Sequence, residues 1–425
     1  MPTFVHHAFG CKVNQYDLER ARRHLVSRGF ESVEHDADLV LLATCAVTTD
    51  AASDGRQKVR SLMRSHPRAR IAVLGCISEQ DRGFYEALTG PVTIVPSARD
   101  DHFLDRLEPL LPAARSAPDR VPRLRTRTFV KIEDGCDLSC SFCIIPSIRG
   151  SARSRPIQQI LTEIEEAVAE RSREIVLTGV HLGHYGRRSP DSLPKLLRAI
   201  GRLQGDFRVR LSSLEVSELT TELLDLLADD PRFVAHLHLP LQSGSETVLR
   251  RMRRPYTAAR FEHEVEAVRS RLSEPSVSTD IIVGFPEETE ADFEDTIDLC
   301  RRVRFCRVHV FPFSPREGTR AFAMSPRVSP AQSRRRRNAL LHLAEDLARH
   351  SRATRIGKEC QVLVERIETD GSASGLDERY HRVMIRPAHP LQRGDLARVQ
   401  VVSQSDGKLI ATLRGTPRTR TETTP

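Results

Sequence analysis

The chain has 425 residues, of which 39% are hydrophobic and 29% charged, with a formal net charge of +8 and a pI of about 9.2. It contains no apolar run near the ~20 residues that a membrane-spanning helix requires and opens with no signal-peptide pattern, so we expect a cytoplasmic protein with no membrane segment. Nine cysteines are too few for a disulfide-rich fold of this length, and in a reducing compartment clustered thiols more often bind metal or do chemistry.

The length predicts three domains, since about 150 residues is usual for one. The first, residues 1–115, alternates short apolar runs with amphipathic stretches, which is typical of a small parallel α/β domain. We expect strands at Phe4–Phe9, Asp38–Ala43, Ile71–Leu74 and Val92–Val95, and helices over Asn14–Arg28, a stretch ending at Ser65, and Ser78–Leu88. The Pro- and Arg-rich stretch from Pro109 to Arg127 shows neither periodicity and is predicted to be a linker.

The second domain, residues 126–350, repeats strand-like runs with helical stretches between them. The runs are FVKI, EIVLTG, RVRLSS, HLHLPL, STDIIVGF and RVHVFPF. Six strands with crossover helices predict an incomplete β/α barrel, whose active site should lie at the carboxyl ends of the strands. A helical stretch that begins at Ser329 and contains Arg334–Arg337 closes the domain.

The third domain, residues 357–415, contains the strand-like runs CQVLVERI, YHRVMIR, LARVQVV and KLIATL, separated by turn residues. These predict a small β-barrel of the nucleic-acid-binding type. The excess of arginine suits a polyanionic partner, although a solvated basic surface explains the charge equally well. The last ten residues, TPRTRTETTP, are predicted to be disordered.

Three cysteines follow the first barrel strand in the pattern C-x3-C-x2-C: Cys136, Cys140 and Cys143. Three thiolates on one short loop can bind three irons of a [4Fe-4S] cluster and leave the fourth iron open. S-adenosylmethionine can chelate such an iron and be cleaved there to a 5′-deoxyadenosyl radical. The alternative is a zinc site, which needs four ligands and usually a second pair of cysteines or histidines, and no second pair lies nearby.

Cys11, Cys45 and Cys76 are far apart in the sequence, but each follows a predicted strand and precedes a predicted helix. In a parallel sheet all three therefore lie at the carboxyl edge, where open α/β sheets bind ligands. We interpret them as ligands of a second [4Fe-4S] cluster; the alternative is ordinary packing of small apolar side chains. Cys300, Cys306 and Cys360 fit neither set and are expected to serve in packing.

The motif CSFCIIPSIRG resembles the cluster motif of the methylthiotransferase family of radical S-adenosylmethionine enzymes, and it includes Pro146, Arg149 and Gly150. The stretches GCKVNQYD, ATCAVT and LGCISEQ resemble the amino-terminal domain of that family. Further resemblance lies in LTGVHLGHYG, LSSLEVSELT, HLPLQSGSETVLRRMRR and STDIIVGFPEET. The last domain is similar to the TRAM module of RNA-modifying enzymes.

This resemblance implies two [4Fe-4S] clusters and S-adenosylmethionine as cofactors, tRNA as partner, and an electron donor such as flavodoxin or ferredoxin. It also implies that strand ends of the barrel hold S-adenosylmethionine; the matching residues are Thr178, Gly179, Glu215, Gln242, Ser243 and Gly244. For Thr178 and Ser243 the alternative is a cap or turn, and for Glu215 a solvated carboxylate.

Within the family, GCKVNQYD and LTGVHLGHYG resemble the branch that acts on N6-threonylcarbamoyladenosine beside the tRNA anticodon. The expected product carries a methylthio group on carbon 2 of that adenosine, and its formation consumes two S-adenosylmethionine molecules. The alternatives are isopentenyladenosine in tRNA, an aspartate of a ribosomal protein, and, from another class, a zinc-stabilised RNA-binding protein without activity.

Overall fold

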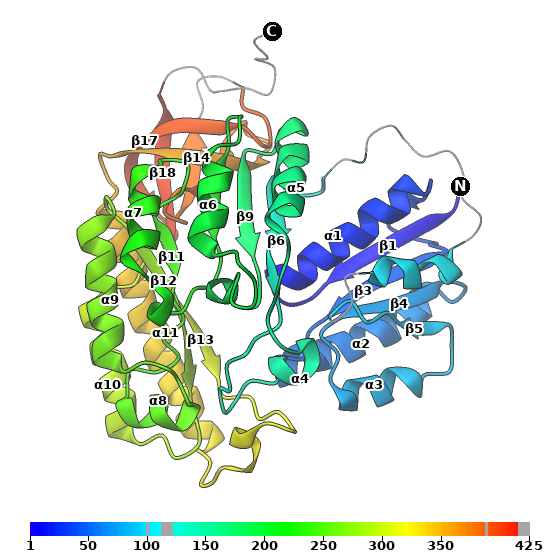
Figure 1. The fold of residues 1–425 in the computed structure, drawn as a ribbon, viewed down its shortest axis with the longest axis horizontal. Coiled ribbons are helices and arrows are strands. Elements are labelled where there is room, and N and C mark those ends of the chain that lie inside the picture. The colour runs from blue at the N-terminus through cyan, green and yellow to red at the C-terminus, as the bar shows by residue number, and fades with distance from the viewer. Residues whose placement is uncertain (99–101, 112–120, 122, 387–389, 415–425) are drawn as a thin grey trace.

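The structure is a computed structural model that describes residues 1–98, 102–111, 121, 123–386 and 390–414. An amino-terminal α/β layer lies beside a larger barrel of parallel strands, and a small closed β-barrel packs at one end of that larger barrel (Figure 1). The three predicted kinds of architecture are therefore confirmed. The exact domain boundaries remain a prediction.

The amino-terminal sheet is parallel, in the order β2-β1-β3-β4-β5, with helices on both faces. Apolar residues of α1 pack on one face, whereas α2 and α3 cover the other. The central strand, β3, is buried along its whole length because helices cover both faces of the sheet. The strands are β1 (Thr3–Ala8), β2 (Glu31–Ser32), β3 (Leu39–Thr44), β4 (Arg70–Gly75) and β5 (Val92–Ile94), and the helices are α1 (Lys12–Ser27), α2 (Thr49–Ser65) and α3 (Glu79–Glu86).

Within the described residues, the wall of the larger barrel consists of the six strands that the sequence predicted. Parallel pairing gives the sheets β10-β9-β6 and β11-β12-β13, and the bridges Val209–Phe233 and Ser213–His238 join β10 to β11. The strands are β6 (Arg127–Lys131), β9 (Glu174–Thr178), β10 (Arg208–Leu211), β11 (His236–His238), β12 (Ser276–Val283) and β13 (Arg307–Pro312). The barrel is incomplete, as predicted.

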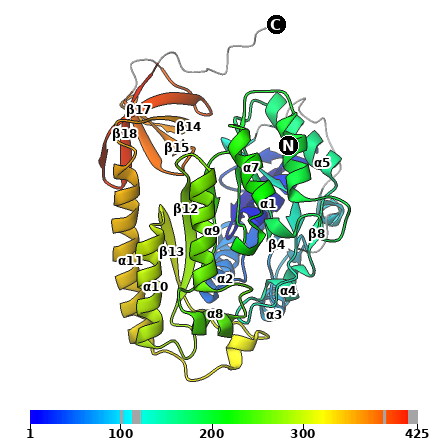
Figure 2. The ribbon, with the colours of Figure 1, turned by 60° about the vertical axis from the view of Figure 1, so that its left-hand side comes forward.

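Helices cover the outside of this barrel and bury a continuous apolar core against its strands (Figure 2). They are α5 (Ile157–Ala169), α6 (Leu193–Gly201), α7 (Thr221–Asp229), α8 (Glu246–Met252), α9 (Ala258–Arg271), α10 (Glu290–Val303) and α11 (Pro330–Ala353). The arginine run lies on α11, where Arg336 is buried against Glu288 while Arg335 is exposed and pairs with Glu290. At least one of the four arginines therefore serves packing.

The carboxyl-terminal barrel is closed, in the order β14-β15-β16-β18-β17. Its strands are β14 (Glu359–Ile367), β15 (Ala373–Asp377), β16 (Arg382–Arg386), β17 (Leu396–Ser405) and β18 (Lys408–Leu413). No sequence pattern predicted β15, because the residues ASGLD are mostly small and show no apolar alternation. Gly375 is required there, since a Cβ would lie 1.8 Å from the carbonyl oxygen of Leu363 on the neighbouring strand.

Across the described part of the chain, no helix is both long enough and apolar enough to cross a membrane. The predicted linker Pro109–Arg127 meets the end of a short 3-10 helix (Glu108–Leu110) and the start of β6, and most of it lies outside the described residues. The predicted disordered tail also lies outside them.

Candidate functional site

Cys11, Cys45 and Cys76, called the N-terminal trio below, lie at the carboxyl edge of the amino-terminal sheet. Cys11 is the exposed N-cap of α1, whereas Cys45 and Cys76 follow β3 and β4 and are buried. A Cβ on Gly10 would lie 3.1 Å from Cys45 Sγ, so the Cys11 loop packs directly on Cys45. The topology thus brings together three residues that are far apart in the sequence.

Asn14, on the first turn of α1, ties the three cysteine loops together. Its side-chain amide donates to the carbonyl oxygens of Phe9 and Thr44, which precede Cys11 and Cys45. Its Oδ1 lies 3.7 Å from Cys76 Sγ. Gly75 leaves the space that Asn14 needs, because a Cβ there would lie 3.0 Å from Asn14 Nδ2. A single buried amide therefore sets the spacing of the N-terminal trio.

Cys136, Cys140 and Cys143, the barrel trio, occupy the loop between β7 (Glu133–Asp134) and α4 (Ile145–Arg149). The loop closes on itself, since Cys136 N–H donates to the carbonyl oxygen of Gly150 at 3.0 Å. Gly135 has a φ of +85°, and a Cβ there would lie 2.2 Å from the carbonyl oxygen of Ser151. The positions around the trio are therefore fixed by backbone contacts before any metal binds.

Two side chains from elsewhere in the larger barrel, one after α8 and one after β9, contact sulfurs of the barrel trio. Arg254 donates to Cys140 Sγ at 3.2 Å and pairs with Glu215. His181 Nδ1 lies 3.7 Å from Cys136 Sγ, and its Nε2 lies 2.8 Å from a Glu218 oxygen. No signal along the chain pointed to the Arg254 contact, because 114 residues separate Arg254 from Cys140.

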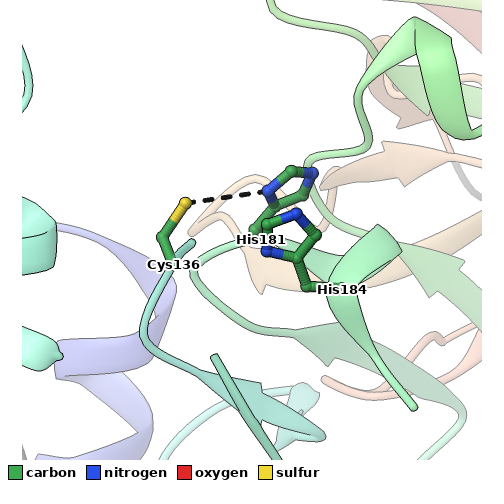
Figure 3. A group of neighbouring side chains, drawn as sticks. All are labelled: Cys136, His181 and His184. Carbon is green, nitrogen blue, oxygen red and sulfur yellow. Dashed lines mark hydrogen bonds between the residues drawn. The ribbon is translucent and has the colours of Figure 1, made fainter. Parts of the chain in front are cut away.

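Figure 3 shows the ring of His184 beside that of His181, with the two rings tilted by 31° and Cys136 facing the pair. Ligand atoms of these three residues lie within 4.8 Å of one another, which suits a zinc ion as a first approximation. However, both ring nitrogens of His184 are already engaged, Nε2 with Arg187 at 2.8 Å and Nδ1 with the Asp137 N–H at 3.5 Å. A zinc ion there would also leave Cys140 and Cys143 without a role.

Burial keeps several of these thiols protonated in the absence of metal. It raises the pKa of Cys76 and Cys136 to about 12 and that of Cys143 to about 11. Sulfurs gathered in threes with high pKa values cannot all ionise unless a metal compensates their charge. Each trio also leaves its metal one protein ligand short of four. The described residues therefore fit iron–sulfur clusters with an open iron.

Arg149 joins the two trios. It ends α4, just after the barrel trio, and its Nε donates to Cys76 Sγ of the N-terminal trio at 3.1 Å. A cavity of about 500 Å³ is lined by residues of both regions, among them Gly75 and Ile144, but by none of the six cysteines. Gly75 adjoins Cys76 and Ile144 adjoins Cys143, so residues next to both trios face one space.

Of the residues expected to hold S-adenosylmethionine, Thr178, Gly179 and Glu215 lie beside the barrel trio. Thr178 is buried, and its hydroxyl has no hydrogen-bond partner among the described residues. Gly179 packs on Glu133, whose pKa is raised to about 9, chiefly by burial. Glu215 is buried and caps a 3-10 helix (Val216–Glu218), so it is not a solvated carboxylate.

Gln242, Ser243 and Gly244 follow β11 and pack towards α10. Gln242 has a φ of +67° and pairs with Ile281 of β12. Ser243 Oγ and Gly244 N–H both bond the Thr296 hydroxyl, at 3.3 and 2.9 Å. The Ser243 hydroxyl and the Gly244 N–H are thus already used within the protein. Whether any of the six residues touches S-adenosylmethionine remains a prediction.

The remaining three cysteines are all buried, and Cys360 also lies within 4.8 Å of ligand atoms of Asp377 and Glu378. Cys300 is part of the core of the larger barrel, Cys360 is part of the core of the carboxyl-terminal barrel, and Cys306 is buried. The two histidines of HLHLPL bond residues of β12: His236 and His238 lie 3.0 Å from Ser278 Oγ. The burial of the three cysteines agrees with the expectation that they serve in packing.

Comparison with protein families gives two matches. Residues 130–300 match the Radical SAM superfamily, and residues 3–95 match a family described as Uncharacterized protein family UPF0004. The first match contains the barrel trio, and the second contains the N-terminal trio.

Curated relatives match almost the whole chain. The threonylcarbamoyladenosine tRNA methylthiotransferase MtaB of Thermotoga maritima is 37% identical, covering 89% of this chain and 90% of its own. The MtaB of Bacillus subtilis is 33% identical, covering 95% and 94%. The tRNA-2-methylthio-N(6)-dimethylallyladenosine synthase of a Parafrankia species is also 37% identical, covering 96% and 87%. Overall identity therefore does not separate the two kinds of relative.

Among solved structures, the radical S-adenosylmethionine methyltransferase TsrM of Kitasatospora setae superposes with a TM-score of 0.56 at 14% identity, over 75% of this chain and 76% of its own. At that identity the likeness concerns the fold alone.

Proposed function

This chain belongs to the methylthiotransferase family of radical S-adenosylmethionine enzymes, and we propose that it adds a methylthio group to carbon 2 of N6-threonylcarbamoyladenosine next to the tRNA anticodon. The zinc-stabilised RNA-binding module without activity is thereby set aside. Three further parts of the proposal are argued from individual residues: the number of clusters, the binding of S-adenosylmethionine and the choice of substrate.

The cofactors in this proposal are two [4Fe-4S] clusters and S-adenosylmethionine. The barrel trio would hold one cluster and the N-terminal trio the other, each by three thiolates. When bound, the barrel cluster would supply the electron that cleaves one S-adenosylmethionine, while a second provides the methyl group and the auxiliary cluster carries the sulfur. The arrangement supports this division, because Arg149 connects the two loops through its hydrogen bond to Cys76 Sγ.

The protein's own part is to orient the reactants and exclude water. Glu215 and Arg254 pair beside Cys140, so a carboxylate and a guanidinium stand next to the barrel cluster, where amino and carboxylate groups of S-adenosylmethionine would arrive. Thr178 contributes a buried hydroxyl without a partner among the described residues at the neighbouring strand end. A tRNA base has to be splayed out of its loop to enter, and the carboxyl-terminal barrel is suited to hold the backbone meanwhile.

Lys12 supports the choice of threonylcarbamoyladenosine as the substrate. This half-buried residue follows Cys11 and has no hydrogen bond or ion pair within the described ranges. Its charge nevertheless reaches barrel residues. Burial is the main cause that lowers the pKa of His309 on β13, and Lys12 adds to it. Burial raises the pKa of Asp280 on β12, but His238, His309 and Lys12 outweigh it and lower that pKa.

A threonylcarbamoyl group carries a carboxylate, whereas an isopentenyl group carries no charge. An ammonium whose charge acts on Asp280 and His309 and that has no protein partner among the described residues therefore favours the first substrate. A charge-assisted hydrogen bond to a carboxylate is among the stronger polar contacts. Isopentenyladenosine and a ribosomal-protein aspartate are the alternatives within the family.

Mass spectrometry of tRNA nucleosides tests the substrate directly. A strain that lacks this gene should lose 2-methylthio-N6-threonylcarbamoyladenosine and accumulate the unmethylthiolated nucleoside, and a plasmid copy should restore it. Loss of the methylthio-isopentenyl nucleoside instead, or no change in either, contradicts the proposal. The electron donor, for which flavodoxin or ferredoxin is suited, can be identified by which of them supports turnover in vitro.

A further inference from the structure

Arg149 makes an unusual set of contacts for a residue that is 1% exposed. Nε donates to Cys76 Sγ at 3.1 Å, one terminal nitrogen donates to both carboxylate oxygens of Asp134 at 2.9 Å, and the other donates to Asn14 Oδ1 at 2.8 Å. Asp17 Oδ2 lies 3.8 Å away. The planar fork of the guanidinium thus bridges the barrel and the amino-terminal layer.

The partners of Arg149 lead directly to both trios. Asp134 lies two residues before Cys136, and Asn14 is the amide that spaces the loops of the N-terminal trio. Lys131 completes the network with 3.0 Å contacts to Asp17 and to Asp134. The positive charges of Arg149 and Lys131 match the two carboxylates, Asp17 and Asp134. Buried charges need such pairing because they have lost their water. The Cys76 sulfur accepts a further hydrogen bond from Arg149, beyond those that the two carboxylates accept.

We propose that Arg149 is a positioning residue that holds the N-terminal trio against the barrel and, by donating to the Cys76 sulfur, stabilises the auxiliary cluster in its reduced form. The inference rests on the proposed function in one respect, namely that Cys76 is a cluster ligand. Hydrogen bonds and positive charge at cluster sulfurs offset the added electron, so they raise the reduction potential and strengthen metal binding.

The barrel trio has a counterpart in Arg254. The side chain of this arginine is also buried, donates to Cys140 Sγ at 3.2 Å and is neutralised by Glu215. Each trio therefore has one buried guanidinium on one sulfur, and the two arginines share no partner among the hydrogen bonds and ion pairs of the described residues. The two clusters should accordingly respond to separate substitutions, so Arg254 provides the control for Arg149.

The full chain is prepared with Cys136, Cys140 and Cys143 changed to Ala, so that only the N-terminal trio can hold a cluster. After anaerobic reconstitution, redox titration monitored by electron paramagnetic resonance gives the midpoint potential, and loss of absorbance in a chelator gives the rate of iron release. Arg149→Lys and Arg149→Gln are compared with Arg254→Lys in this background, and apo-protein melting temperatures report folding.

We expect both Arg149 variants to release iron about tenfold faster and to shift the one-electron equilibrium about tenfold towards the oxidised cluster, a fall of about 60 mV. Arg149→Lys keeps the positive charge, but a lysine cannot reach Cys76, Asp134 and Asn14 at once. If Arg149→Gln does not fold, the potential and iron release of Arg149→Lys therefore test the proposal. Arg254→Lys should change neither quantity, because its sulfur partner is already absent.

The possible outcomes distinguish the role of Arg149 from the existence of the second cluster. If the triple variant binds no cluster at all, the second cluster of the proposed function is refuted. If it binds a cluster whose potential and iron release stay the same in Arg149→Lys, Arg149→Gln and Arg254→Lys, the role of Arg149 is refuted while the cluster stands. A lower melting temperature with an unchanged potential also overturns it, since that is what a merely structural residue would show.

Discussion

Glu174 accepts a hydrogen bond from Arg208 at 2.6 Å, and this buried pair couples the two barrels of the molecule. Arg208 continues to the carbonyl oxygens of Gln361 and Leu376, which belong to β14 and β15. Arg210 bonds Glu174 as well and reaches the Asp377 carbonyl oxygen. One carboxylate therefore holds two arginines that anchor the carboxyl-terminal barrel.

The first prediction concerns acid. Burial alone would raise the pKa of Glu174, but Arg208 and Arg210 outweigh burial and lower it to about 2. A lowered folded-state pKa means that stability is fully present above the unfolded value of 4.5 and is lost as the pH falls towards 2. This shift in the pKa of Glu174 corresponds to a contribution of roughly 3 kcal/mol to the free energy of unfolding at neutral pH. Denaturant unfolding of metal-free Glu174→Gln should show a shallower pH dependence in this window than the unaltered chain.

The control for this prediction is Glu262→Gln, which breaks an exposed pair with Arg302. An exposed pair contributes little, so this variant should keep the acid sensitivity of the unaltered chain. Equal slopes for all three proteins between pH 4.5 and 2 would show that Glu174 is not the titrating group.

The second prediction concerns Gly179. A methyl group there would lie 2.8 Å from Glu133 Oε2 and 3.0 Å from the Glu133 carbonyl oxygen. Gly179→Ala should therefore destabilise the protein by about 1–3 kcal/mol through overpacking and loosen the loop that carries His181. Gly83→Ala is the matched control, because nothing lies within 4 Å of its Cβ. Thermal melting of the two variants should differ, and equal melting temperatures would contradict the contact.

The third prediction separates ligand cysteines from packing cysteines. The reconstituted chain should contain about eight iron atoms, and Cys76→Ala or Cys140→Ala should each lower this to about four. Cys300→Ala should leave the iron content unchanged, since Cys300 lies in the apolar core. Iron and sulfide assays measure this, and about four atoms in the unaltered chain would exclude a second cluster.

The fourth prediction concerns the substrate carboxylate. Lys12→Gln should lower kcat/KM for tRNA that carries threonylcarbamoyladenosine by about tenfold to a hundredfold, the usual value of a charged hydrogen bond. Its iron content should not change. Lys195→Gln, which alters an exposed lysine on α6 paired with Asp191, serves as the control. An unchanged kcat/KM for Lys12→Gln would remove the support for this substrate.

The sequence was informative where local pattern reflects burial. Runs such as EIVLTG predicted strands because a strand covered on both faces must be apolar throughout, and β9 is buried along its length. The strand β15 was missed because close approach to Leu363 selects a glycine there, and small residues carry no alternation. Arg336 was likewise not predictable, because nothing in the run Arg334–Arg337 indicates which of the four arginines is buried against Glu288.

By itself the sequence determined the two cysteine sets, the family they resemble and the order of the three architectures, because metal-ligand spacing and strand periodicity are local properties of a chain. Only the tertiary structure decided which charges meet the sulfurs. Arg149 reaches Cys76 across 73 positions and Arg254 reaches Cys140 across 114. Such contacts depend on how separate strand ends converge in space, and no periodicity along the chain encodes that convergence.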